Sequence, residues 1–321
     1  MEVNKELVLQ VNELFHDFEG DRYHEKHDDI FDGERDRWSE IGSMLESDRA
    51  SGSRRLLDIG TGTGFVPLTL GRFLKEGDVF ICSDISQNIL DAAKKNIGQK
   101  SFSCGLEFLK VDGSSFVGIV DGSIDIVTVN SVLHHLPDLD SFFEEMARVL
   151  KPGGKIIIGH EPNQSFFRNR FLWTQYEILT LISHPKQLAY RLIKSVGLSA
   201  LVKRIVNNQS LSKPSEYQQI VQKINQVLLD RRVISESLSE SEVSQLIDFQ
   251  SPTAGGFDRE KGINIPDVLK RHQRFSVVSY ETYNHVYRLS HKNIIFQRYS
   301  SFLRAYFPKD GAAFFAILEK H

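Results

Sequence analysis

Three glycines at alternating positions are suited to a ligand-binding turn near residue 60 of this 321-residue chain. Gly60, Gly62 and Gly64 follow the apolar run RRLLDI and precede a stretch with helical periodicity. Glycine tolerates positive φ angles and lets a ligand approach the backbone closely. The spacing is GxGxG, and Phe65 stands where the dinucleotide-binding motif GxGxxG needs glycine, which argues against a nicotinamide cofactor. The P-loop pattern GxxxxGK followed by Ser or Thr is absent as well.

Polar side chains follow the next apolar runs along the chain. Asp84 ends VFICSD, Asp112 follows LEFLKV, and Asn130 lies near the end of DIVTVN. These positions correspond to the carboxyl ends of parallel strands, where open α/β sheets bind ligands, and a carboxylate there can accept both hydroxyls of a ribose. Two structural alternatives stay open. Asp84 could cap the following helix, although Ser86 fits that role better, and Asp112 could be a turn residue before Gly113.

Alternating strands and helices would position these residues. Short apolar runs separated by helical patterns predict βαβ units and a parallel sheet of the doubly wound α/β class. A helix over residues 138–150 has Asp138 or Asp140 near its start. The predicted strands lie in residues 54–60, 78–85, 106–115, 123–133, 155–163, 275–289 and 312–321.

Two other stretches break this alternation. The N-terminal stretch predicts helices with an acidic, aromatic loop between them, and residues 163–250 predict helices only. We therefore expect an α/β core interrupted by a helical insertion. The predicted units are an N-terminal helical lid segment (1–50), the core (51–162 and 259–321) and the insertion or cap (163–258).

The composition is that of a globular protein, with 40% hydrophobic and 25% charged residues and a net charge of −3, which argues against a general polyanion binder. Cys82 and Cys104 form neither a disulfide framework nor a CxxC pair, as is usual in a reducing cytosol. We expect no signal peptide, no membrane-spanning helix and a cytoplasmic location. We also expect no metal site, because His16, His24 and His27 lack zinc-ligand spacing.

Taken in order, five segments resemble the class I S-adenosylmethionine-dependent methyltransferase superfamily: LLDIGTGTG, ICSDIS, VDGSS, DIVTVNSVLHHL and KPGGKIIIGHEPN. The resemblance covers about residues 54–162, a third of the chain, and the terminal FFAILEKH suits the family's last strand. It implies a seven-stranded, mostly parallel, Rossmann-like sheet and S-adenosylmethionine as cofactor. It further implies that Asp58 and the Gly60–Gly64 turn contact the amino-acid end of the cofactor and that Asp84 contacts the ribose. Ile85 would then lie against the adenine face, and Asp112 and the Gly113 amide would contact the adenine edge. Asn130 and Ser131 would line the methyl-donor end.

Methyl transfer is an in-line displacement that needs a general base only if the acceptor arrives protonated. His160 and Glu161, at the end of the fifth predicted strand, could supply that base or could anchor the following loop. His135 is a further candidate, although a structural role fits both it and His134 better. The acceptor could be contacted by Tyr23, His24 and His27 of the N-terminal segment, unless these lie on an exposed helix, and by Trp173 of the insertion.

Residues 166–206 contain seven Lys or Arg and one Glu, a local charge of about +6, among many aromatic residues. This stretch predicts either a cap over a largely apolar acceptor pocket or peripheral contact with an anionic membrane. The loop after the fourth predicted strand reads NSVLHHL and lacks the Asn-Pro-Pro-Tyr motif of amino-methylating enzymes of the family. We therefore expect O- or C-methylation of a small apolar or aromatic metabolite and no nucleic-acid partner. An RNA or protein methyltransferase and a non-catalytic cofactor-binding protein stay as alternatives, and the oligomeric state is not predicted.

Overall fold

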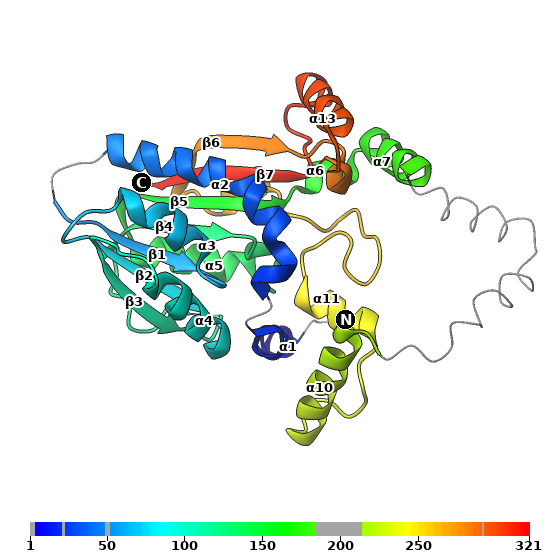
Figure 1. Cartoon of the computed structure of the whole chain (residues 1–321), viewed down its shortest axis with the longest axis horizontal. Coiled ribbons are helices and arrows are strands. Elements are labelled where there is room, and N and C mark those ends of the chain that lie inside the picture. The colour runs from blue at the N-terminus through cyan, green and yellow to red at the C-terminus, as the bar shows by residue number, and fades with distance from the viewer. Residues whose placement is uncertain (1–3, 21–22, 49–51, 114, 184–213, 291) are drawn as a thin grey trace, which may run out of the picture.

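A seven-stranded sheet forms the centre of the computed structural model in Figure 1. The structure describes residues 4–20, 23–48, 52–113, 115–183, 214–290 and 292–321, without the side chains of residues 23–33. The strand order is β3-β2-β1-β4-β5-β7-β6. Neighbouring strands from β1 to β5 are parallel, and β7 is antiparallel to both β5 and β6, which confirms the predicted mostly parallel, doubly wound sheet. The strands are β1 (Arg55–Ile59), β2 (Val79–Asp84), β3 (Gly105–Lys110), β4 (Ile124–Asn130), β5 (Leu150–Pro162), β6 (Phe275–Tyr283) and β7 (Ala313–Lys320).

Helices cover both faces of this sheet because alternate residues of each buried strand point in opposite directions. Leu56 of β1 packs toward α2 (Tyr23–Ser47) and α3 (Phe65–Leu70), where Trp38 is fully buried. Leu57 packs on the other face toward α5 (Leu139–Val149) and α12 (Ile265–Arg271). On the α3 face, Cys82 is a buried thiol against α4 (Gln87–Gly98).

Helix-capping side chains fix where the helices near the sheet edge begin. Ser86 accepts a hydrogen bond from the Ile89 amide at the start of α4, as its sequence position predicts. Asp138 does the same for the Ser141 amide at the start of α5. The helix after the glycine turn is shorter than the sequence pattern suggests, since α3 ends at Leu70 and a 3-10 turn, η2 (Gly71–Phe73), follows.

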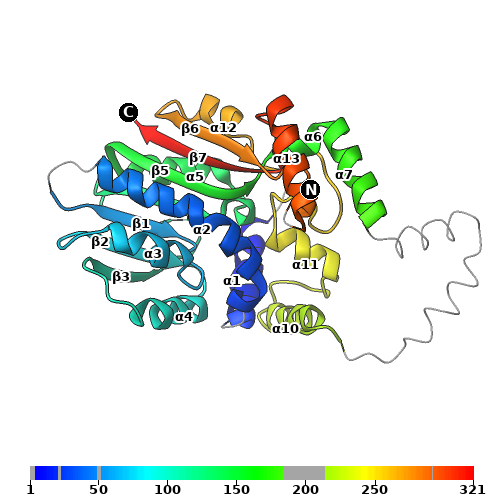
Figure 2. The same cartoon turned by 45° about the horizontal axis from the view of Figure 1, so that its top comes forward.

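The insertion is helical in its described part and joins the N-terminus in one layer. It contains α6 (Gln164–Arg168), α7 (Arg170–Ser183), α10 (Glu216–Asp230) and α11 (Glu240–Ile247). Val11 and Leu14 of α1 (Lys5–Glu19) share a hydrophobic cluster with Ile224 of α10 and Val243 of α11. Figure 2 shows these three helices side by side, next to the sheet edge at which the strands from β1 to β5 end. Residues 184–213 of the predicted helical insertion lie outside the described residues.

Two sequence predictions are wrong in detail. The aromatic loop expected within the N-terminal segment is helical, since α2 runs without a break from Tyr23, and Trp38 makes this helix part of the core. The strand expected over 275–289 ends at Tyr283, because Asn284 adopts a φ of +60° that turns the chain out of the sheet. A 3-10 turn, η5 (Tyr287–Leu289), and an unpredicted helix, α13 (Ile294–Tyr306), follow.

Among the described residues, every helix is too short or too polar to cross a bilayer.

Candidate active site

Two adjoining cavities open at the carboxyl-terminal edge of the sheet. The narrow cavity, of about 230 Å³, includes the residues just after β2 and β3, and the wide cavity, of about 620 Å³, includes those at the end of β5. Helix α1 contributes Leu9 to the narrow cavity and Phe15 to the wide one. The two cavities share the turn after β1 and the end of β4, so a ligand in one would meet a ligand in the other there. The shared residues include Gly60, Gly62, Asn130 and Ser131.

The glycine turn between β1 and α3 has the backbone that its sequence predicts. Gly60, Gly62 and Gly64 have φ angles of +63°, +55° and +100°. A Cβ atom on Gly60 would lie 2.4 Å from Cγ2 of Val132, which is far inside van der Waals contact. Glycine therefore keeps side chains out of the space beside this turn, where a ligand can approach the backbone.

Asp58, in β1, connects this turn to the neighbouring strand β4. Its Oδ2 accepts a hydrogen bond from the Thr61 hydroxyl at 2.7 Å, and its Oδ1 accepts one from the Thr128 hydroxyl of β4 at 2.6 Å. Burial raises the pKa of Asp58 to about 7, against the opposing effect of the two hydroxyl donors. These contacts make Asp58 a positioning residue, and its direct contact with a cofactor stays a prediction.

Replacing Gly60 with alanine is expected to lower the free energy of unfolding by about 2–4 kcal/mol, because positive φ and the collision with Val132 act together. Cofactor affinity should fall as well. Gly122→Ala is the matched control, because Gly122 has a similar φ of +58° but nothing within 4 Å of the added Cβ. It should lose about 1–2 kcal/mol at most. Equal losses in urea unfolding of the two variants would contradict the steric argument.

Asp84 lies at the end of β2 and lines the narrow cavity. Its Oδ2 accepts a hydrogen bond from the Gly62 amide and its Oδ1 one from the Ser86 amide, each at 3.0 Å. Burial raises the pKa of Asp84 to about 6, although these backbone donors oppose the shift. Because each carboxylate oxygen can accept two hydrogen bonds, both can still bind a hydroxyl group.

A family model described as a methyltransferase domain matches residues 57–158. This range contains the glycine turn, Asp84 and Asn130, which meet at the two cavities. Residues 57–158 form a methyltransferase domain of the class I S-adenosylmethionine-dependent superfamily. The cofactor of this superfamily, and of the chain, is S-adenosylmethionine.

Known relatives of this methyltransferase domain match about half of the chain. It is 25% identical over 154 residues to a ubiquinone/menaquinone biosynthesis C-methyltransferase of Vibrio vulnificus, covering 48% of this chain and 58% of that protein. It is 26% identical over 149 residues to the protein of the same name from Pseudomonas putida, covering 46% and 57%. The chain thus spans less than two thirds of these relatives. A solved methyltransferase from Aquifex aeolicus has 20% identity, a TM-score of 0.33, and coverage of 40% of this chain and 73% of its own.

The narrow cavity of this methyltransferase fits the adenosine part of the cofactor. Asp84 presents its carboxylate there, and Ile85, Ile89 and Phe116 supply apolar walls for a planar base. A Cβ on Gly113 would lie 2.8 Å from Cδ2 of Leu9, so glycine keeps this end of the cavity open. Of the residues implied for ribose and adenine by the sequence resemblance, Asp84, Ile85 and Gly113 thus line one cavity, and their individual contacts stay predictions.

Asp112 and Asn130 occupy different positions relative to this cavity. Asp112 lies in a neighbouring hollow, and its Oδ1 accepts a hydrogen bond from the Ser115 amide at 2.9 Å, as in the turn role that the sequence left open. Asn130 lines both cavities, and its Oδ1 accepts a hydrogen bond from Trp38 Nε1 at 2.9 Å. This bond orients the Asn130 amide at the boundary between the two cavities.

Glu161, at the end of β5, is fully buried and holds the turn after β4. Its Oε1 accepts hydrogen bonds from the amides of Val132 and Leu133 at 2.6 and 2.7 Å. Its Oε2 lies 2.8 Å from Nδ1 of His134 and also accepts from the His134 amide at 3.2 Å. Both carboxylate oxygens are thus engaged, and these contacts favour the anchoring role over that of a base.

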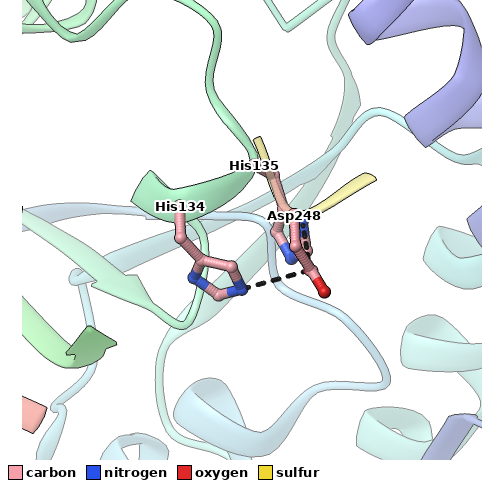
Figure 3. Close-up of side chains that lie close together, drawn as sticks. All are labelled: His134, His135 and Asp248. Atoms are coloured by element: carbon pink, nitrogen blue, oxygen red, sulfur yellow. Dashed lines mark ion pairs between the residues drawn. The ribbon is translucent and has the colours of Figure 1, made fainter. Parts of the chain in front are cut away.

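His134 and His135 converge on Asp248 of the insertion (Figure 3). Burial disfavours the charged form of His134, but the carboxylates of Glu161 and Asp248 outweigh it and raise the pKa of this histidine. His135 Nδ1 lies 2.8 Å from the Ile247 carbonyl, and burial, aided by His134, lowers its pKa to about 4. The pKa of His134 therefore lies above that of His135, which makes His134 the better proton acceptor of the two.

His134, His135 and Asp248 each offer a ligand atom within 4.8 Å of the others, the geometry of a possible metal site among the described residues. Nδ1 of His134 contacts the Glu161 carboxylate. Nδ1 of His135 lies within hydrogen-bond distance of the Ile247 carbonyl oxygen, which can only accept a hydrogen bond, so this nitrogen carries a proton. These contacts leave Nε2 of each histidine available to a proton or a metal ion, and the expectation of no metal stays a prediction.

His160 lies in the wall of the wide cavity. Its Nδ1 is 3.3 Å from both Glu34 Oε1 of α2 and the Tyr283 hydroxyl of β6. Burial opposes ionisation of Glu34, but the hydrogen bond and charge of His160 and the charge of Arg37 bring the carboxyl pKa below its usual value. His160 thus links α2 to the sheet, and its role as a base stays a prediction.

Backbone strain is concentrated around the wide cavity. Five described residues other than glycine have positive φ, and four of them line this cavity. Such conformations are unfavourable for residues with a Cβ and are typical of functional sites. They are Ser131 (+57°), His160 (+53°), Asn284 (+60°) and Tyr287 (+48°).

The remaining acceptor candidates either lie away from the two cavities or have side chains that the structure does not describe. Trp173 packs in an aromatic cluster, where its ring stacks on Phe257 at 3.9 Å. The side chains of Tyr23, His24 and His27 are not among those described, so their role stays a prediction. Sequence reasoning missed the wide-cavity residues Asp248, Tyr287 and Arg288 and placed His134 as structural. The vicinal histidines after β4 were the available signal for His134.

Proposed function

We propose that this chain transfers the methyl group of S-adenosylmethionine to a carbon or oxygen of a small apolar or aromatic acceptor. The observation that carries the proposal is the wide cavity, which adjoins the cofactor cavity at the glycine turn and Asn130. Its lining combines four aromatic residues with a larger number of polar side chains, so it suits an aromatic acceptor that carries hydroxyl or carbonyl groups. The aromatic residues are Phe15, Phe65, Tyr217 and Tyr287.

The chain's own residues supply binding and orientation. Asp84 and the amides of the glycine turn would hold the cofactor, and Asn130 orients the boundary between the two cavities. Bound there, S-adenosylmethionine supplies a methyl group on a positively charged sulfur, which becomes a neutral thioether. Helices α1, α10 and α11 form the outer wall of the wide cavity and would exclude water from the acceptor, which favours displacement by the acceptor over hydrolysis.

His134 is the residue best placed to take a proton from the acceptor. The Glu161 carboxylate fixes the proton of the neutral ring on Nδ1, which leaves Nε2 with its lone pair in the wide cavity. The acceptor's O–H or acidic C–H proton would pass to Nε2, and its electron pair would form the bond to the methyl carbon. Asp248, whose Oδ1 lies 3.7 Å from Nε2, would stabilise the imidazolium that results.

Names of the relatives support carbon as one acceptor atom, since both matched proteins are called C-methyltransferases. An acidic carbon needs a base more than an amine does, and the His134–Glu161 pair answers that need.

Methyl transfer is tested with S-adenosylmethionine that carries a labelled methyl group. We expect the full chain to move the label to a phenol, hydroquinone or enolisable aromatic ketone within a panel of acceptors, and mass spectrometry would show one methyl group replacing one hydrogen. Heat-inactivated protein is the control. Cofactor binding without transfer to any acceptor would favour a non-catalytic binding protein, and label found only in RNA or protein would reassign the substrate class.

A further inference from the structure

Exposed apolar side chains are concentrated on two neighbouring helices, α7 and α13. Of the twelve large apolar residues that stand most exposed in the described part of the chain, seven lie on α7 and α13. Each of the seven is between 51% and 72% exposed. Single exposed apolar residues are ordinary, but a contiguous group is typical of an interaction surface. The seven are Phe171, Ile178 and Ile182 on α7, and Ile294, Ile295, Phe302 and Tyr306 on α13.

The two helices carry apolar stripes of the same period. Phe171, Ile178 and Ile182 follow the spacing i, i+7, i+11, and so do Ile295, Phe302 and Tyr306. This spacing places each set of three on one side of its helix. We call these six residues the α7/α13 face.

Contacts at the edges of the stripes hold the two helices together, as Figures 1 and 2 both show for the ribbons. The Tyr299 hydroxyl of α13 donates a hydrogen bond to Gln175 Oε1 of α7 at 2.8 Å, and the rings of Phe171 and Phe307 lie 5.6 Å apart. Tyr299 also stacks on Phe302, whose ring lies 4.9 Å from that of Tyr306. The two stripes therefore lie on either side of the contact between α7 and α13 and form one surface.

The charge around the α7/α13 face differs from that of the chain as a whole. Residues 284–309, which include α13, contain five Arg or Lys and no Asp or Glu, whereas the whole chain carries −3. One of these cations, Arg304, is paired with Glu281 of β6. Arg298 lies three residues after Ile295 and four before Phe302, so it belongs to the same side of α13. Aromatic and aliphatic residues with cations beside them are the pattern of a helix that lies on an anionic lipid surface.

We propose that the α7/α13 face docks on the surface of an anionic phospholipid bilayer. The apolar stripes would enter the region between headgroups and acyl chains, with Arg298 at the phosphates. The turn that precedes α13 contains Tyr287 and Arg288, which line the wide cavity, so docking would bring that cavity next to the membrane. The proposal stands on these surface features and does not depend on methyl transfer.

The test is co-sedimentation of the full chain with vesicles of phosphatidylcholine, with and without one quarter phosphatidylglycerol. The wild-type chain should bind the anionic vesicles, more weakly as salt rises, and bind neutral vesicles little. The double variant Ile295→Asp/Phe302→Asp should bind the anionic vesicles with an affinity at least about tenfold lower than that of the wild-type chain. The matched control is Val120→Asp/Val278→Asp, which makes the same charge change at two exposed aliphatic residues away from the face and should bind as wild type.

Thermal melting establishes that both double variants are folded. No binding by the wild-type chain at low salt, or equal binding by the two double variants, would overturn the proposal. A wild-type dimer in analytical ultracentrifugation that only Ile295→Asp/Phe302→Asp dissociates would assign the face to a second copy of the chain instead.

Discussion

A His134→Gln variant is expected to have a kcat for methyl transfer about 10²- to 10⁴-fold below that of the wild-type chain, the range that a positioned general base supplies. Glutamine can still donate a hydrogen bond to Glu161 Oε2, which His134 contacts at 2.8 Å, but it cannot accept a proton from the acceptor. Cofactor affinity, measured by calorimetry, should change little, since Asp84 and the glycine turn hold that ligand. Single-turnover rates measured at saturating cofactor isolate the chemical step.

The neighbouring histidine provides the control for this variant. His135 has a pKa lowered to about 4 and lies within hydrogen-bond distance of the Ile247 carbonyl, so it is neutral and engaged at working pH. His135→Gln should therefore keep most of the activity. Equal rates for wild type and His134→Gln would show that His134 only supports the turn. Activity abolished by a chelator and restored by a divalent ion would instead assign the His134, His135 and Asp248 cluster to a metal.

The pH profile separates a base from a structural histidine. Since a base must be neutral, the rate should rise with pH as His134 loses its proton. The Glu161 carboxylate favours the charged ring, so Glu161→Gln should lower the pKa of His134 and move this rise to lower pH. A purely structural role for the pair would reduce stability without moving the profile.

The cofactor half of the site was predictable from sequence because its residues follow local patterns. The glycine turn, Asp84 and Asn130 each come directly after an apolar run, and parallel strands bring such ends together. Chain order alone therefore placed these residues at one edge of the sheet. The capping role of Ser86 was equally local and was confirmed.

The acceptor half depends on contacts between distant segments. Glu161 and His134 are 27 residues apart, and they meet because β4 and β5 pair with Asn130 opposite Gly159. Asp248 reaches His134 only through the fold of the insertion, which no short pattern specifies. In the C-terminal part, aromatic and β-branched residues continue past Tyr283, so composition hid the end of β6, and the positive φ of Asn284 decides it.

The second large effect is expected for Asp84→Asn, which should bind the cofactor roughly 10- to 100-fold more weakly than the wild-type chain at pH 8. This loss corresponds to the contribution of a charge-assisted hydrogen bond. Both carboxylate oxygens already accept backbone amides, and a ribose needs a second acceptor site on each of them. An asparagine side chain has one oxygen, so it cannot satisfy the amides and both hydroxyls together. Calorimetric titration with S-adenosylhomocysteine measures this loss, and unchanged affinity would remove Asp84 from the ribose site.

The same carboxylate should make affinity depend on pH. Because burial raises the pKa of Asp84 to about 6, the group is charged above that pH and neutral below it, so affinity should fall as pH drops from 8 to 5. 5′-Methylthioadenosine is the suitable probe, since it keeps the ribose and adenine but lacks the amino-acid groups that titrate nearby. Asp58, with a pKa of about 7, is a second buried acid, so Asp58→Asn is the matched control. The inflection of affinity near pH 6 should persist in Asp58→Asn and vanish in Asp84→Asn. The reverse result would assign the pH dependence to Asp58.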